Sequence, residues 1–188
     1  MPDWSEPLVA ASEALGEPSY LSDAQSLATF LVDHRYQDNF LAHALAGEEA
    51  TVKAFLNDYV YVIDALLALH RVTHETNWLE IAIRLQREQD KLFWNNDNNA
   101  YYFTRSGDQE LFTPIKETAD VISPSGNGVA LSNLLNLFEV TGEVRFHQQA
   151  VLLRQSLEPL VFRSPEGSPF LLTVIGRMDS ESVEQEPN

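Results

Sequence analysis

The sequence contains no cysteine, and this absence excludes several kinds of chemistry at once. The chain has no disulfide bond, no thiolate ligand for zinc and no thiol nucleophile. It also has no apolar run near the roughly 18 residues that a membrane-spanning helix needs, so we predict no membrane partner. The N-terminal MPDWSEPLVA lacks a basic region, which disfavours a signal peptide. A cytoplasmic location is the simplest interpretation.

Basic residues are scarce, with 12 Lys and Arg against 28 Asp and Glu, for a net charge of −16. The electrostatic field of this negative charge repels the phosphate backbones of nucleic acids, so we predict no nucleic-acid partner. Part of the excess lies in residues 178–188, whose acidic and polar composition predicts a disordered tail. The other residues, 1–177, are predicted to form a single domain.

Common catalytic and metal-binding motifs are absent as well. There is no GxSxG, no P-loop and no GxGxxG motif. His70 and His74 stand four residues apart, but the segment HRVTH lacks the glutamate of a zinc-binding HExxH motif. His34, His43 and His147 have no ligand partners by spacing. We therefore predict no metal and no cofactor.

What the sequence does contain is an internal repeat. Residues 65–94 align without a gap with residues 133–162, at an offset of 68, and residues 20–31 align with the first copy at an offset of 58. An aromatic, a small residue and a leucine recur at i, i+4 and i+7, which places them on one helical stripe. The matched triplets are Tyr20, Ala24 and Leu27; Trp78, Ala82 and Leu85; and Phe146, Ala150 and Leu153.

Each copy is predicted to contain two helices and a short ribbon. The first helix is apolar almost all round, which predicts burial on all sides, and the second has a single apolar face. β-prone patches follow at 40–42, 101–104 and 170–174. We predict an all-α fold of three αα-hairpins, at about 4–46, 55–105 and 127–174, that forms part of an (α/α) toroid with short β-ribbons between the hairpins.

Three segments carry a resemblance to a known family. FLNDYVYVIDALLALHRVT resembles LDDYA…LLALYEAT, SPSGNGVALSNLLNL resembles PSGNSVAA-NLLRL, and FWNNDNNAYYFT resembles FWD…GGFFFT. These motifs belong to the thioredoxin-domain-containing, spermatogenesis-associated proteins, which join a thioredoxin-like domain to a six-hairpin (α/α)6 toroid. The resemblance runs from Trp4 to about Val174 and implies the C-terminal half of that toroid. The toroid of that family is similar in fold to the toroids of acylglucosamine 2-epimerases and six-hairpin glycosidases.

The sequence departs from the family pattern in two respects. The thioredoxin-like domain and the earlier hairpins are not in this sequence. The paired acids of LDDYA are Asn57 and Asp58 here, so one carboxylate is missing. The family's biochemical activity is poorly defined, so the resemblance implies no substrate.

The repeat predicts one cluster of polar residues. Asp58 and Gly126 are equivalent positions near the starts of inner helices, and such helix starts gather at one mouth of a toroid. Free amide groups there favour an anion or a sugar hydroxyl, and carboxylates beside a lysine could serve as general acid and base. The candidates are Asp58, Glu117 and Asp120 as catalytic residues, and Tyr59, Lys116, Ser125, Gly126 and Asn127 as substrate-binding residues.

Each candidate also has a structural interpretation. Asp58 is placed to cap a helix, as are Ser125 and Asn127, and residues 116–120 are typical of a solvated charged loop. Two hypotheses for function follow. The first is a non-catalytic interaction or assembly module, whose apolar flanks are covered by a second copy or by a longer-chain partner. The alternative is a carbohydrate-binding or carbohydrate-processing site, of the epimerase or glycosidase type, at the toroid mouth.

Overall fold

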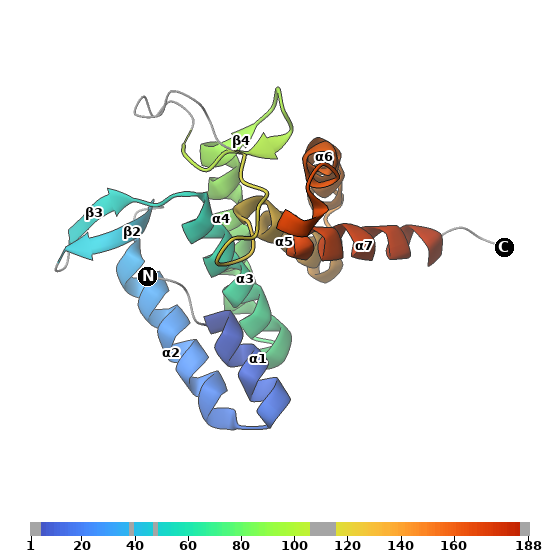
Figure 1. Ribbon diagram of the computed structural model, residues 1–188. Helices are drawn as coiled ribbons and strands as arrows, with labels where there is room; N and C mark the ends of the chain where they lie inside the picture. The colour runs from blue at the N-terminus through green and yellow to red at the C-terminus, as the bar shows by residue number, and fades with distance from the viewer. Residues whose placement is uncertain (1–4, 38–39, 47–48, 106–115, 185–188) are drawn as a thin grey trace. The chain divides into compact units, whose positions relative to one another are not determined.

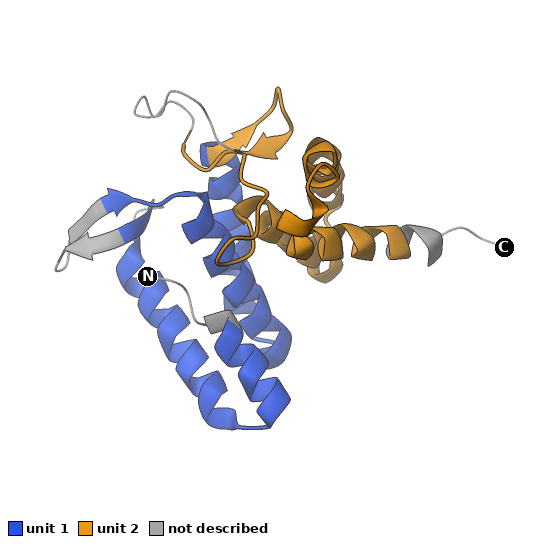
Figure 2. Cartoon of the chain, viewed as in Figure 1, with its two compact units in different colours: residues 1–92 blue, residues 93–188 orange. Residues whose placement is uncertain are grey.

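The computed structural model describes the backbone of residues 5–37, 40–46, 49–105 and 116–184, which is mostly helical (Figure 1). The chain divides into two compact units, residues 1–92 and 93–188 (Figure 2). The first unit contains α1 (Ser5–Leu15), α2 (Pro18–Arg35), β1 (Tyr36–Gln37), β2 (Phe40–Ala46), β3 (Glu49–Lys53), α3 (Leu56–Thr73) and most of α4 (Thr76–Phe93). The second contains β4 (Trp94–Asn95), β5 (Ala100–Tyr101), α5 (Gly126–Thr141), α6 (Val144–Val161), the 3-10 turn η1 (Pro165–Gly167) and α7 (Pro169–Glu184).

The repeat predicted from the sequence is confirmed in the element boundaries. The second helices of the three hairpins, α2, α4 and α6, are each 18 residues long. They begin and end at positions related by the offsets of 58 and 68. The first helices, α1, α3 and α5, end at Leu15, Thr73 and Thr141, which are equivalent in the same alignment. Three αα-hairpins therefore follow one another along the chain.

The hairpin turns repeat as well. Gly16, His74 and Gly142 occupy equivalent positions and have φ values of 65°, 58° and 68°, in the left-handed region. This is the usual way in which a helix ends before an abrupt change of direction. Each backbone N–H donates to the carbonyl four residues earlier, at 3.0, 2.8 and 2.8 Å. The acceptors are Ser12, His70 and Phe138.

Burial separates the two helices of a hairpin as predicted. Helix α3 buries residues around most of its circumference, and α5 does the same. Helix α4 instead buries one face and exposes charged side chains on the other. The buried residues of α3 are Leu56, Tyr59, Val60, Val62, Ile63, Ala65, Leu66, Leu67 and Leu69.

Short antiparallel sheets follow the first two hairpins. Strands β1, β2 and β3 form a three-stranded sheet in that order, and β4 pairs with β5. The predicted ribbon at 40–42 lies in β2, whereas the one predicted at 101–104 overlaps β5 at Tyr101 alone and is wrong for residues 102–104. Register is shifted within β2, where Ala42 faces Lys53 and Ala44 faces Val52, so His43 is an extra residue in a β-bulge.

The predicted third ribbon at 170–174 is wrong, because these residues lie in α7. Leu171, Val174, Ile175 and Met178 are buried, and their spacing of three and four residues is the helical period. The same helix extends to Glu184, so the predicted disordered tail is wrong for residues 178–184. Residues 185–188 of that tail lie outside the described part of the chain. Whether the two units form one domain stays a prediction.

Candidate functional site

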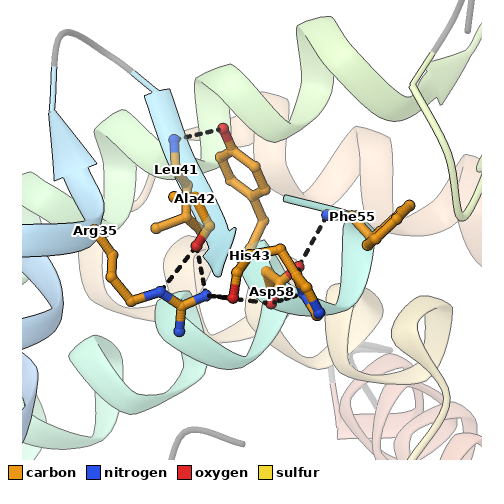
Figure 3. A network of polar contacts seen from close by, with 7 residues as sticks. Arg35, Leu41, Ala42, His43, Phe55 and Asp58 are labelled. Carbon is orange, nitrogen blue, oxygen red and sulfur yellow. Dashed lines mark hydrogen bonds and ion pairs between the residues drawn. The ribbon is translucent and has the colours of Figure 1, made fainter. Parts of the chain in front are cut away.

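Asp58 lies at the centre of a polar network in the first unit (Figure 3). Its carboxylate accepts a hydrogen bond from the backbone N–H of Phe55 at 2.9 Å, and so caps the start of α3. The Nδ1 atom of His43 lies 2.8 Å from Oδ2, and Nη2 of Arg35 lies 3.7 Å from Oδ1. The side chains of Asp58 and Arg35 are only 12% and 10% exposed, whereas that of His43 is 43% exposed.

Arg35 holds the bulge of β2 in place. Its guanidinium, at the end of α2, donates to the carbonyl oxygens of Ala42 and His43. A β-bulge leaves backbone groups without a ladder partner, and these two bonds satisfy the carbonyls of that segment. The backbone N–H of Leu41 donates to the hydroxyl of Tyr59 at 3.4 Å. Arg35, Asp58 and Tyr59 thus fix the strand that contains His43.

A second polar group in the same unit joins β1 to α4. The hydroxyl of Tyr36 donates to Glu88 Oε1 at 3.1 Å, and the Arg84 guanidinium lies over the Tyr36 ring, 5.2 Å from its centroid. Burial raises the pKa of Glu88 above its ordinary value, and the hydrogen bond from Tyr36 opposes that shift. Burial, and then the charge of Glu88, raise the pKa of Tyr36.

Asn127 joins three parts of the second unit. Its side chain is fully buried at the start of α5. The amide nitrogen donates to the carbonyls of Tyr101 and Glu117, both at 3.0 Å, and the amide oxygen accepts from the backbone N–H of Tyr101 at 3.2 Å. Asn127 therefore ties β5 and the loop at Glu117 to the helix start.

Asp120 connects the starts of two helices. Its Oδ1 accepts from the backbone N–H of Ser125 at 2.7 Å, just before α5, and its Oδ2 accepts from Phe170 at 2.8 Å, in the first turn of α7. Ser125 is the N-cap of α5, and its hydroxyl accepts from the N–H of Gly128 at 3.3 Å. Free amides at helix starts favour negative charge, so one carboxylate stabilises both helices.

Lys116 makes a further link within the second unit. Its Nζ lies 2.9 Å from the hydroxyl of Ser156 in α6 and 3.5 Å from the carbonyl of Asn98. Gly126 is buried in the first turn of α5.

The predicted site residues fall into the two separate units. Asp58 and Tyr59 belong to the first, and the predicted residues of the segment 116–127 belong to the second. The structure brings Asp120 and Ser125 together, and Asn127 with the backbone of Glu117. The meeting of both groups at one mouth, and the catalytic and binding roles, stay predictions.

Sequence reasoning missed Arg35, Tyr36, His43 and Glu88. Spacing along the chain gives no sign of these contacts, which arise when β1 and β2 fold against α3 and α4. In the described ranges, the structure has no group of three or more His, Asp or Glu side chains placed to hold a metal ion. No helix of those ranges has the length and apolarity to cross a bilayer.

Comparison with known proteins finds relatives that match most of this chain. No protein-family model matches it. Spermatogenesis-associated protein 20 of Mus musculus is 31% identical over 173 residues, which is 86% of this chain. The Homo sapiens protein is 30% identical over 172 residues, again 86% of the chain. The chain is homologous to part of spermatogenesis-associated protein 20. It spans 22% of the length of each of these relatives.

Solved structures with the same fold are α/α-toroid proteins. A GH76 α-mannanase of Bacteroides thetaiotaomicron matches with a TM-score of 0.67 at 16% identity, over 84% of this chain and 43% of its own. A GH76 mannosidase of the same organism has a TM-score of 0.66 at 17% identity, over 81% and 42%. A D-mannose isomerase has a TM-score of 0.61 at 18% identity, over 82% and 38%. This chain thus has the fold of part of an (α/α) toroid, as predicted.

Proposed function

We propose that this chain is an assembly module, whose part of an (α/α) toroid associates with further helical hairpins. The observation that supports this most is the use of the polar residues at the start of α5. Asp120 accepts from two helix starts, and the Asn127 side chain makes three hydrogen bonds to backbone groups. These side chains hold the fold together, so a structural role accounts for them without a catalytic one.

The chain matches only part of each toroid structure. The toroids that this chain matches are longer, and the chain covers only 43% of the GH76 α-mannanase and 38% of the D-mannose isomerase. A partial set of hairpins has flanks that a complete ring would cover. We propose that a second copy of this chain supplies the covering hairpins.

An apolar surface on the second unit is the proposed contact. It comprises the exposed hydrophobic side chains on and directly after α6, which we term the α6 apolar surface. Exposed apolar side chains recur at intervals of eight residues along α6, and burial against a protein partner would remove them from solvent. Its members are Val144, Leu152, Leu160 and Phe162.

Light scattering on charged variants tests this proposal. Leu152→Lys combined with Phe162→Lys places two charges in the α6 apolar surface, and we expect it to lower the mass toward the 21.2 kDa of a single chain. Val52→Lys is the matched control, because Val52 and Leu152 are both 41% exposed and Val52 lies on β3. Equal masses for wild type, double variant and control would contradict the proposed contact.

Saccharide recognition is a second candidate function. Its support is the pairing of His43 with Asp58, together with a fold shared with a mannanase, a mannosidase and a D-mannose isomerase. D-mannose is the natural first probe. An increase in the thermal unfolding midpoint with D-mannose would support this candidate, and an unchanged midpoint at saturating sugar would count against it.

A further inference from the structure

The hydrogen-bonding state of His43 follows from its partner. Nδ1 lies 2.8 and 2.9 Å from the two carboxylate oxygens of Asp58. The other groups around that carboxylate, the Phe55 N–H and the Arg35 guanidinium, are donors and suit an ionised carboxylate that only accepts. Nδ1 therefore bears a hydrogen, and in the neutral form of the imidazole this leaves the lone pair on Nε2.

Asp58 and His43 are each held in place by contacts with other parts of the fold. Asp58 is fixed in the first turn of α3 by the Phe55 N–H, and His43 is the extra residue of the β2 bulge. Bulges redirect side chains and occur often beside functional sites. Arg35 is nearly buried and binds the carbonyls of the bulge segment, so the backbone that carries the imidazole is held in position.

The outer edge of the imidazole is available to a ligand. Its side chain is 43% exposed, and Nε2 has no hydrogen-bond partner in the described part of the chain. The ring of Phe55 lies edge-on to it, with centroids 5.4 Å apart, and supplies an apolar neighbour. A lone-pair acceptor beside an aromatic ring suits a hydroxyl on a carbon skeleton, and the net charge of −16 disfavours an anion.

We propose that His43 is a binding residue for a neutral hydroxyl-bearing ligand of the saccharide class, whose O–H group donates to Nε2, with Asp58 as the positioning residue. This inference rests on the second candidate function and assigns its contact residue. It is independent of the proposed assembly, which is tested by mass alone.

Substitution of Asp58 by asparagine tests the positioning role. The new amide keeps the shape of the carboxylate and can still accept from Phe55, but its NH₂ group would donate to Nδ1 and move the ring hydrogen to Nε2. Imidazole ¹⁵N spectra at neutral pH are expected to show the Nδ1–H tautomer for His43 in wild type and the Nε2–H tautomer in Asp58→Asn. His34 and His147, which have no carboxylate bond among the described residues, give reference signals in the same spectrum. An Nε2–H tautomer in the wild type overturns the inference.

Titration with D-mannose tests the binding role. In the wild type, D-mannose is expected to shift the His43 Nε2 resonance. In Asp58→Asn the affinity for D-mannose is expected to be about tenfold lower, because one hydrogen-bond acceptor is lost. In His43→Phe, which keeps a ring beside Phe55, we expect no measurable binding. Circular dichroism verifies that the variants fold. Binding of D-mannose that leaves the His43 signals and both variants unaffected overturns this inference while the saccharide candidate stands. Absence of binding to the wild type overturns both.

Discussion

Several polar side chains of this protein stabilise the starts of its helices. Asp58, Asp120 and Ser125 each satisfy backbone N–H groups at the start of a helix, and Asn127 joins a helix start to a strand and a loop. Buried polar groups that lose such partners cost about 1–3 kcal/mol each. These side chains therefore stabilise the fold, whereas the side chain of His43, beside Asp58, is partly exposed to solvent.

Gly128 gives a residue-scale prediction of packing at the start of α5. A Cβ there would lie 2.9 Å from Ser125 Oγ and 3.2 Å from a ring carbon of Phe170. We expect Gly128→Ala to lower the free energy of unfolding by about 1–3 kcal/mol, because it crowds the capping hydroxyl and α7. Gly176→Ala is the matched control, since a Cβ there meets nothing within 4 Å, and it is expected to raise stability by up to about 1 kcal/mol. Equal effects in chemical denaturation would show that the crowding argument is wrong.

Glu88 gives a prediction for pH. Its pKa is raised in the folded state, so the folded chain holds that proton more tightly than the unfolded chain does. The stabilisation is present at low pH and is lost as the pH rises above the unfolded value through the folded value. Glu88→Gln keeps an acceptor for Tyr36 without the charge. Its stability relative to wild type, measured by urea denaturation, is expected to increase as the pH rises above about 4.5. A difference that stays constant or decreases over this range contradicts the assigned cause.

At the scale of elements, the turns of the three hairpins share one backbone conformation but differ in the residue that adopts it. His74 occupies the left-handed position that is glycine in the other two copies. A non-glycine residue in this conformation is strained by about 1 kcal/mol or more, partly offset by the greater chain freedom of glycine when unfolded. We expect His74→Gly to raise the free energy of unfolding by about 0.5–1 kcal/mol and Gly142→His to lower it by about 1 kcal/mol. Thermal unfolding checks both, and a destabilised His74→Gly would indicate that the histidine side chain contributes to the turn.

The repeat made most of these elements predictable from the sequence. Equivalent positions such as Ala24, Ala82 and Ala150 are all fully buried, because a small residue on the inner stripe lets helices approach closely. The segment 170–174 was predicted to be a strand because branched and aromatic residues are typical of strands. In the structure, Pro169 and the Asp120 carboxylate favour the start of a helix there. Five residues are too few to separate the period of a strand from that of a helix.

The candidate site was less predictable, for a physical reason. Helix capping is local, so the capping roles of Asp58 and Ser125 could be proposed from position alone. The contact between His43 and Asp58 depends on a bulge in β2 and on a guanidinium that stabilises it, and neither follows from spacing. Long-range polar contacts of this kind need the fold before they can be predicted.

At the scale of the whole molecule, the chain is homologous to part of spermatogenesis-associated protein 20 and has the fold of part of an (α/α) toroid. It covers 22% of those relatives and 43% of the first matched toroid structure. We propose that such a module is completed by association, and that the polar residues at the start of α5 support it and do not catalyse a reaction.

The mass of the wild-type chain across a dilution series tests this central claim most directly. Sedimentation equilibrium or light scattering at micromolar and lower concentrations gives the weight-average mass without a change to the protein. We predict a mass that rises with concentration from the 21.2 kDa of one chain toward twice that value, as two copies cover each other's flanks. A mass that stays at 21.2 kDa throughout, from a folded sample, would contradict the proposed association.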